Sequence, residues 1–206
     1  MGKQIWKPGN MVYPVPAVMV TVADEARGAN IITVAWTGTT CTNPPMAYIS
    51  VRKERYSHGL LKKTGEFVIN LTTEELAYAT DFCGVRSGRQ VDKFGEMKLT
   101  PIPAQSVSAP LILESPVNIE CKVRQVQELG SHDMFLAEVT AVHADEQYLD
   151  ETGRFDLSRA HPIVYCHGEY YGLGRKLGTF GYSVRKKKGT AKRRSAAGGR
   201  SAGKRG

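Results

Sequence analysis

The stretch that decides the fold class runs from Asn30 to Ser57 and reads NIITVAWTGTTCTNPPMAYISVRKERYS. Apolar, β-branched runs at residues 31–36 and 46–51 enclose the small, hydroxyl-rich block TGTTCT. Between them, Asn43-Pro44-Pro45 interrupts the chain and forces a turn. Runs of this composition on either side of a turn predict two neighbouring β-strands.

Hydroxyl, basic and aromatic side chains gather where these two strands end. Trp36 closes the first run, and Ser50, Arg52 and Ser57 lie at or just beyond the end of the second. Hydroxyl and guanidinium groups satisfy phosphate oxygens, and small residues let the backbone approach a ring closely. The stretch therefore predicts a site for a flat aromatic ligand that carries a phosphate.

The rest of the body is typical of a mainly β protein with short helices. Further strands are predicted at residues 18–22, 67–71, 116–128, 134–144 and 163–171. Short helices are expected at residues 57–65 and from a capping box at 72–75 towards Phe82, and a helical turn or short helix is expected at 87–94. A hairpin connection at 129–133 and a bulge near Gln125 are also expected. Long strands and short loops favour a closed or nearly closed antiparallel barrel with helical insertions.

Basic charge is concentrated at the C-terminal end of the 206-residue chain. From Arg185 onward there are ten Lys and Arg residues and no acid, whereas the remainder has 18 basic and 20 acidic residues. The tail has no apolar side chain larger than Ala, so we expect it to be disordered. The sequence thus predicts a domain at residues 1–184 and a basic tail at 185–206, with at most weak, salt-sensitive contacts to nucleic acid.

Composition excludes several classes of protein and site. No apolar run approaches the length of a membrane span, and no signal-peptide segment opens the chain, so a soluble, cytoplasmic protein is expected. Cys41, Cys83, Cys121 and Cys166 are widely spaced, which argues against a zinc site or a disulfide framework. Neither the phosphate-loop motif nor the dinucleotide fingerprint is present. No metal site is expected.

Five segments in matching order resemble a known family. They are NIITVAWTG, ISVRKERYSH after the Pro-Pro turn, GEFVINL, CGVRSGRQVDKF and SHDMFLAEV. Together they are similar to the flavoredoxin branch of the flavin reductase-like, FMN-binding split-barrel proteins, and the similarity spans the body without the tail. This resemblance implies a six-stranded antiparallel Greek-key split β-barrel with helical insertions. It also implies a homodimer with FMN in a groove near the dimer interface.

The resemblance further implies which residues contact FMN. The implied cofactor-binding residues are Asn30, Trp36, Thr37, Gly38, Thr39, Thr40, Cys41, Ser50, Val51, Arg52, Ser57, Lys93, His132 and Tyr165. Within this set, residues 37–41 would line the ring edge, and Ser50, Val51, Arg52 and Ser57 would meet the phosphate end. The family often has Thr where this chain has Ser57, and the hydroxyl is kept. Lys93 would lie either beside the N1–C2 edge of the flavin or at the phosphate.

These features predict an FMN-dependent oxidoreductase that passes electrons from a donor such as NAD(P)H to an acceptor. No catalytic side chain is expected, because the cofactor carries the hydride chemistry. A flavin reductase and a flavoredoxin-like carrier both remain open, as does a redox role for Cys41 or Cys83. Two alternatives are a flavin-binding sensor or store without turnover, and a basic protein associated with nucleic acid.

Overall fold

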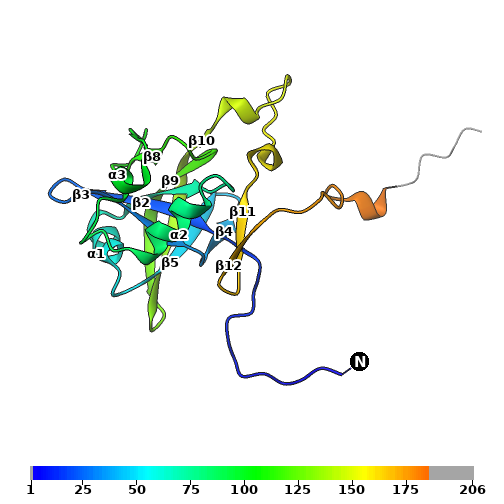
Figure 1. Cartoon of the computed structure of the whole chain (residues 1–206), viewed down its shortest axis with the longest axis horizontal. Coiled ribbons are helices and arrows are strands. Elements are labelled where there is room, and N and C mark those ends of the chain that lie inside the picture. The colour runs from blue at the N-terminus through cyan, green and yellow to red at the C-terminus, as the bar shows by residue number, and fades with distance from the viewer. Residues whose placement is uncertain (1, 186–206) are drawn as a thin grey trace, which may run out of the picture. The chain divides into compact units, whose positions relative to one another are not determined.

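The computed structural model describes residues 2–185. The chain forms two compact units, Met1–Leu173 and Gly174–Gly206. The first unit contains the sheets and helices of Figure 1. In the second, the described part holds one short turn of 3-10 helix, η3 (Tyr182–Val184). The predicted basic tail lies outside the described residues apart from Arg185, so the boundary predicted at residue 184 stays a prediction.

A seven-stranded antiparallel sheet forms the first unit (Figure 1). Its strands, in spatial order, are β3 (Gly28–Val34), β2 (Val18–Asp24), β6 (Glu66–Leu71), β9 (Val117–Glu128), β10 (His132–Ala144), β5 (Met46–Arg52) and β4 (Thr37–Cys41). The two edge strands, β3 and β4, follow each other in sequence through Ala35 and Trp36. The sheet curls into a barrel. Strand β4 pairs with β5 only as far as Ile49, so the barrel stays split between β3 and the end of β5, as the predicted fold class requires. It counts seven strands because the hydroxyl-rich block pairs with β5 as the edge strand β4.

Two smaller sheets and several helices complete this unit. The small sheets contain β1 (Val15–Pro16), β11 (Ile163–Cys166) and β12 (Glu169–Gly172), and separately β7 (Pro101–Ile102) and β8 (Leu111–Ile112). The helices are α1 (Tyr56–Thr64), α2 (Ala77–Val85), α3 (Lys93–Met97), η1 (Glu146–Tyr148) and η2 (Leu157–Ala160). None of the helices in residues 2–185 has the length and apolar character to cross a membrane.

Two local predictions are confirmed. Helix α1 ends at Gly65, which adopts a φ of 65° and donates its N–H to Leu61 O. Only a residue that tolerates the left-handed region ends a helix in this way without strain. A bulge also interrupts the β9–β10 pairing, because Leu136 pairs with Gln125 and Ala137 pairs with Val123.

Two local predictions are wrong, and a third is confirmed only in part. The strand expected at 163–171 is a hairpin, because His167 and Gly168 adopt positive φ values of 50° and 90° and turn the chain back. The helix expected from residue 72 begins at Ala77, because the Thr72 hydroxyl donates to Ala17 O instead of capping a helix. At 87–94 the expected helical turn is present, because Gln90 N–H and Val91 N–H both donate to Ser87 O, whereas a regular helix begins only at Lys93, capped by the Asp92 carboxylate.

Two of the three buried apolar clusters in the described residues pack on opposite faces of strand β3, and the third is a small one around Val68, Ala109 and Leu111. The barrel interior packs large side chains such as Phe67 and Phe135 with Leu60 and Leu61 of α1. A second cluster packs α2 and α3 against the outer face of β2 and β3 and includes Ile31. Burial of this apolar area drives the folding of both layers.

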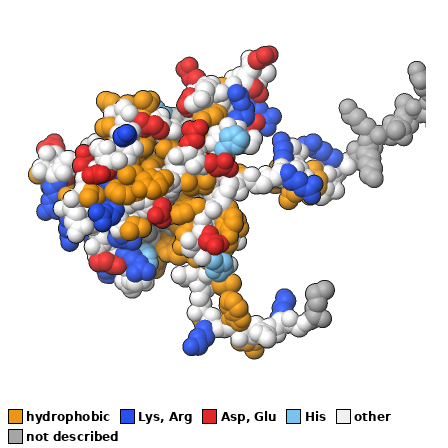
Figure 2. Space-filling view, viewed as in Figure 1, with side chains coloured by type: hydrophobic (Ala, Val, Ile, Leu, Met, Phe, Trp, Pro, Cys, Tyr) orange, Lys and Arg blue, Asp and Glu red, His pale blue; other side chains and the backbone are white. Residues whose placement is uncertain are grey.

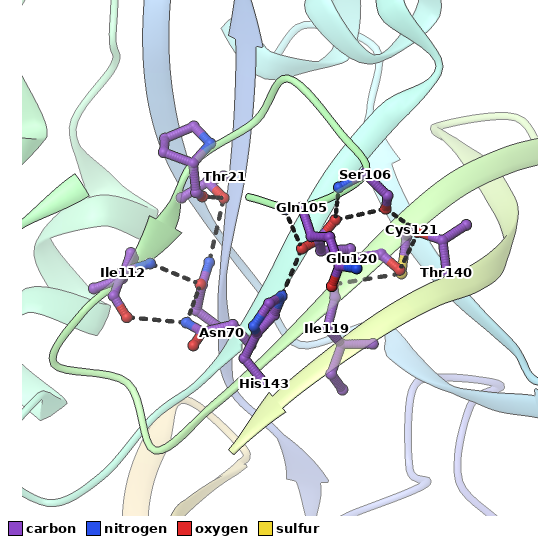
Figure 3. A network of polar contacts seen from close by, with 12 residues as sticks. Thr21, Asn70, Gln105, Ser106, Ile112, Ile119, Glu120, Cys121, Thr140 and His143 are labelled. Carbon is purple, nitrogen blue, oxygen red and sulfur yellow. Dashed lines mark hydrogen bonds and ion pairs between the residues drawn. The ribbon is translucent and has the colours of Figure 1, made fainter. Parts of the chain in front are cut away.

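A buried polar network ties the segment between α3 and β9 to the barrel (Figure 3). The Asn70 amide accepts from Ile112 N–H at 3.1 Å and donates to Met19 O at 2.9 Å. The Glu120 carboxylate accepts from both Gln105 N–H and Ser106 N–H, and His143 Nε2 lies 2.6 Å from it. Because these buried groups are satisfied internally, the network stabilises the fold rather than offering sites for a ligand.

Candidate functional site: a groove along the split of the barrel

A groove follows the split in the barrel between β3 and β5. It consists of three adjoining hollows of about 240, 190 and 550 Å³. The first two share Ile32, Arg52 and Arg55, and the second and third share Trp36 and His132, among others. Strand β3 pairs with β2 on one side only, so its other edge offers backbone donors and acceptors to the groove.

The first hollow, called here the cationic cleft, lies where β3, α1 and the segment after α2 meet. Its lining residues are Asn30, Ile32, Arg52, Glu54, Arg55, Tyr56, Ser57, Cys83, Arg86, Ser87, Gly88 and Lys93. Four of these are basic and one is acidic. Hydroxyl groups, a glycine and an excess of cations are the groups that bind a phosphate.

Lys93 is the most unusual residue of the cationic cleft. Its side chain is buried, and Nζ donates to two neutral acceptors, Ile31 O at 2.6 Å and Cys83 O at 2.7 Å. Within residues 2–185 no carboxylate forms an ion pair with it. Burial, reinforced by Arg55, lowers the pKa of Lys93 to about 8. An anion in the cleft would supply the charge that this ammonium lacks.

Asn30 and Ser57 join two walls of the cationic cleft. Asn30 Nδ2 donates to Ser57 Oγ at 2.7 Å, and both side chains are buried. Gly88 packs so closely on Asn30 that a Cβ at this position would collide with the Asn30 amide oxygen and with the Tyr56 ring. The cleft therefore needs a glycine at residue 88, where the backbone approaches the Asn30 side chain.

Two arginines border both the first and the second hollow. Arg55 Nη1 donates to Gly84 O at 2.9 Å, which holds its guanidinium over the end of α2. Arg52 is exposed and lies 3.6 Å from Glu54 Oε1. Lys53, between them in sequence, points elsewhere and pairs with Glu128 and the buried Asp133. Arg55 is exposed like its neighbours in this basic cluster, but its bond to Gly84 O fixes the guanidinium at the border of the two hollows.

The second hollow is lined by aromatic, apolar and small polar groups. Its lining residues are Ile32, Thr33, Val34, Ala35, Trp36, Ser50, Val51, Arg52, Arg55, His132 and Tyr165. Ser50 N–H donates to Trp36 O at 2.8 Å and so holds the Trp36 backbone against β5. Burial and the Arg52 guanidinium hold the pKa of His132 below its ordinary value. At neutral pH this imidazole is therefore predominantly uncharged and offers one donor and one acceptor.

An aromatic wall closes the groove on the side of the small β1–β11–β12 sheet. The Tyr13 ring lies 6.1 Å from both the Trp36 and Tyr165 rings and 4.4 Å from the His167 ring. Tyr165 also contacts Tyr170 edge-on at 5.6 Å. Such a wall provides the large, flat apolar surface that a ring system needs.

Nine of the residues predicted from the sequence to contact the cofactor lie at the groove, and the other five do not. Those at the groove are Asn30, Trp36, Ser50, Val51, Arg52, Ser57, Lys93, His132 and Tyr165. Thr37, Gly38, Thr39, Thr40 and Cys41 line none of the three hollows. Thr37 instead donates its hydroxyl to Tyr48 O at 2.7 Å. A flavin contact from residues 37–41 remains a prediction.

Sequence reasoning missed several residues of the groove. Arg86, Ser87 and Gly88 line the cationic cleft, whereas the sequence places them only within a family motif. Tyr13 lies behind the groove, where its ring contacts Trp36 and Tyr165 of the second hollow. The dipeptide Ser87-Gly88 between two basic residues, directly after a helix, is a usable signal for an anion site. Tyr13 has no local signal, because its place depends on the β1–β11 pairing.

Thiol and metal chemistry find little support in the described residues. Burial raises the pKa of Cys83 to about 11 and that of Cys121 to about 12, so both remain thiols at neutral pH. Cys83 lines the cationic cleft, but a protonated thiol is a poor nucleophile. Within residues 2–185 no three His, Cys, Asp or Glu side chains are grouped to hold a metal ion.

Comparisons with known proteins agree with this geometry. The flavin reductase like domain matches residues 10–174. Flavoredoxin of Desulfovibrio vulgaris (Miyazaki F) is 30% identical, with a TM-score of 0.83 over 89% of this chain and 100% of that chain. An uncharacterized protein of Aeropyrum pernix is 30% identical over 75% of this chain, which spans only 58% of that relative. An NADH:FMN oxidoreductase of Rhodococcus qingshengii is 26% identical over 77% of this chain and 76% of the relative. The family resemblance read from the sequence is confirmed.

Proposed function

Because this chain belongs to the flavin reductase like domain family, we propose that it is an oxidoreductase that binds FMN in the groove along the split of the barrel. The cationic cleft would hold the phosphate, and the second hollow would hold the ring system. When bound, FMN supplies the hydride and electron chemistry. The protein contributes binding, orientation and electrostatics, which explains why no catalytic side chain needs to be assigned.

The observation that carries this proposal is the buried, unpaired ammonium of Lys93 in the cationic cleft. A phosphate dianion accepts charge-assisted hydrogen bonds from ammonium, guanidinium, hydroxyl and backbone N–H groups. Lys93, Ser57 and the Ser87-Gly88 backbone provide three of these four kinds, and Arg55 provides the guanidinium. Of the two positions considered for Lys93, the phosphate is favoured, because Ser57, Ser87 and Gly88 line the same cleft.

The second hollow suits an isoalloxazine for independent reasons. Trp36 and Tyr165 offer flat apolar surfaces, while Ser50, His132 and the free edge of β3 offer hydrogen-bonding groups. Both kinds of contact are needed, because a flavin ring has apolar faces and a polar pyrimidine edge. The third hollow adjoins this one at Trp36 and His132 and is the proposed entry for an electron donor or acceptor.

The proposed electron donor is NAD(P)H, and this finer assignment rests on the Rhodococcus relative, whose printed name is NADH:FMN oxidoreductase. A flavoredoxin-like electron carrier is the second candidate, which the Desulfovibrio neighbour favours. A carrier holds its FMN permanently, whereas a reductase of the exchanging kind releases it as a product. The same groove serves either function.

A homodimer is also proposed. The N-terminal segment exposes Ile5, Trp6, Met11 and Val12 to solvent within the single chain (Figure 2). Large exposed apolar side chains favour burial against another protein surface. The molar mass, measured by light scattering as the protein elutes from a size-exclusion column, tests the proposed dimer. A monomer at micromolar concentration would contradict the proposal.

The first test of the function is the absorbance spectrum of the purified protein, followed by identification of any flavin released on heating. We expect flavin bands and released FMN. Oxidation of NADH and NADPH is then followed with and without added free FMN. Turnover that needs no added flavin supports a tightly bound cofactor, and turnover only with added FMN supports an exchanging reductase. A protein that neither carries nor binds FMN would contradict the proposal.

A further inference from the structure

Two pairs of neighbouring residues each have one member at the groove and the other inside the barrel. Ser57 and His58 open helix α1, and His132 and Asp133 open strand β10. Ser57 and His132 line the groove, in its first and second hollows respectively. The other member of each pair is buried, and the two meet inside the barrel, with His58 Nε2 at 2.8 Å from Asp133 Oδ2.

The bond between His58 and Asp133 is nearly shielded from water. The Asp133 side chain is 1% exposed and the His58 side chain is 10% exposed. The His58 ring also packs edge-on against Phe135 at 5.6 Å, which fixes its orientation. A buried carboxylate needs such a partner, because it has lost its hydration.

Two lysines and one glutamate face this pair. Lys53 and Lys62 lie 3.3 and 3.8 Å from the Asp133 carboxylate, and both also approach Glu128 of β9. Asp133 Oδ1 has no hydrogen bond within residues 2–185, so Lys53 balances it only as an ion pair. His58 therefore gives the carboxylate its one short, directional contact.

The bond continues into a chain of contacts across three walls of the groove. Asn30 on β3 donates to Ser57, Ser57 is followed by His58 on α1, and His58 reaches Asp133 on β10. Asp133 pairs across the sheet with Val51 of β5, whose neighbour Arg52 borders the cationic cleft.

We propose that His58 and Asp133 form a positioning pair, which sets the distance between Ser57 and His132 and thereby the affinity of the groove for FMN. This inference rests on the proposed function. Neither residue of the pair touches the ligand. If the bond is lost, α1 and β10 shift relative to each other, and the contacts at the phosphate end and the ring end no longer form together.

The chain offers a matched control for this idea. The Glu120–His143 pair also joins a buried carboxylate to a histidine, at 2.6 Å, and it likewise involves β10, here with β9 (Figure 3). It binds the loop at Gln105 and Ser106 and lines no hollow of the groove. Loss of either bond removes a contact between a histidine and a buried carboxylate, but only the His58–Asp133 bond connects the groove walls.

The test compares FMN dissociation constants of the full chain, freed of flavin, for wild type, His58→Phe, His58→Gln and His143→Phe. His58→Phe keeps the packing on Phe135 but loses the bond, and we expect its dissociation constant to rise at least about tenfold, as for other residues that orient a binding group. His58→Gln keeps a donor and should stay within about threefold. His143→Phe should stay within about twofold, because distant sites act independently.

A second measurement separates positioning from a general loss of stability. Ser57→Ala is combined with His58→Phe, and we expect the double variant to lose much less affinity than the two single losses combined, since both act through one contact. Should His58→Phe fail to fold, His58→Asn replaces it, because its shorter amide does not reach Asp133. Wild-type affinity in a folded His58→Phe variant, or an equal loss in His143→Phe, would overturn the inference while leaving the proposed function intact. Failure of the wild type to bind FMN would overturn both.

Discussion

Two buried charges in this protein have opposite surroundings. The Glu120 carboxylate accepts bonds from Gln105, Ser106 and His143, and these outweigh its burial and lower its pKa to about 2. Lys93 has only two neutral carbonyl partners, and its burial lowers the pKa to about 8. Both shifts are large, but the first favours the charged form and the second opposes it.

The difference distinguishes a structural charge from one held ready for a ligand. Glu120 has its partners within the fold, so its charge stabilises the folded state without any addition. Lys93 is held in a cleft with further cations, where its charge is unfavourable until an anion arrives. An incompletely paired buried charge beside an open cleft is therefore the better indicator of a binding site.

The largest expected effect concerns stability. Glu120→Ala removes a buried carboxylate that accepts from Gln105 N–H, Ser106 N–H and His143, so the free energy of unfolding should fall by about 3–5 kcal/mol. Denaturant unfolding measures this change. FMN affinity of the folded variant should be unchanged, and a large loss of affinity would show that the two regions are not independent.

The Glu120 carboxylate should also make the free energy of unfolding depend on pH in the acid range. Because the pKa of Glu120 falls from 4.5 to about 2 on folding, its charge stabilises the folded state fully above pH 4.5. This contribution, about 3 kcal/mol from the size of the shift, is lost as pH falls from 4.5 towards 2. Unfolding measured between pH 5 and 2.5 for wild type and Glu120→Gln tests this. If the free energy of unfolding falls equally with pH in the two proteins, this prediction is contradicted.

Loss of the other charge should affect binding. Lys93→Met removes the buried partner of the phosphate, and FMN affinity should fall about a hundredfold, as when one member of a buried charged pair is truncated. Lys93→Arg keeps the charge and should retain most of the affinity. Isothermal titration of the flavin-free protein measures both. If Lys93→Met binds FMN like the wild type, Lys93 is not a phosphate ligand.

Alkaline pH should weaken binding in a related way. The pKa of Lys93 is about 8 in the free protein, so above this pH the side chain must take up a proton before it can pair with the phosphate. FMN affinity should therefore fall by up to about tenfold per pH unit above pH 8. Lys93→Arg should remove the decline. A wild-type affinity that is constant from pH 7 to 9.5 would contradict the assignment.

The smallest effect is expected at the exposed border of the cleft. Arg55→Gln removes a cation that water partly screens, so FMN affinity should fall only about fivefold, within the range for exposed charges. Lys122→Gln, in a surface ion pair with Glu66 away from the groove, is the matched control and should have no effect. Equal losses from both variants would indicate a non-specific charge effect.

Much of the fold could be predicted from the sequence, because alternation and β-branched runs mark each long strand locally. Strands β2, β5, β6, β9 and β10 were all expected, as was the bulge in β9. The hairpin at His167 was missed, since neither His167 nor the flanking run of aromatic residues marks a turn as strongly as Asn-Gly does. Strand β4 was missed because TGTTC resembles a loop, and only its pairing with β5 makes it a strand.

The site was less predictable than the fold. Asn30, Ser57 and Lys93 were named through the family motifs, yet their shared cleft depends on α3 packing against β3, which no local pattern contains. The same limit explains Arg55, whose guanidinium is fixed by Gly84 O, 29 residues further along the chain. Pairwise contacts between distant segments therefore decide which charges of a cluster face the ligand.

The central claim is that the cationic cleft is a phosphate site at one end of a flavin groove. Titration of the same flavin-free protein at pH 7 with FMN and with riboflavin, which lacks the phosphate, tests it most directly. The account predicts that FMN binds more tightly by at least about a hundredfold, as a buried charge-assisted contact requires. Equal affinities for the two flavins would contradict it.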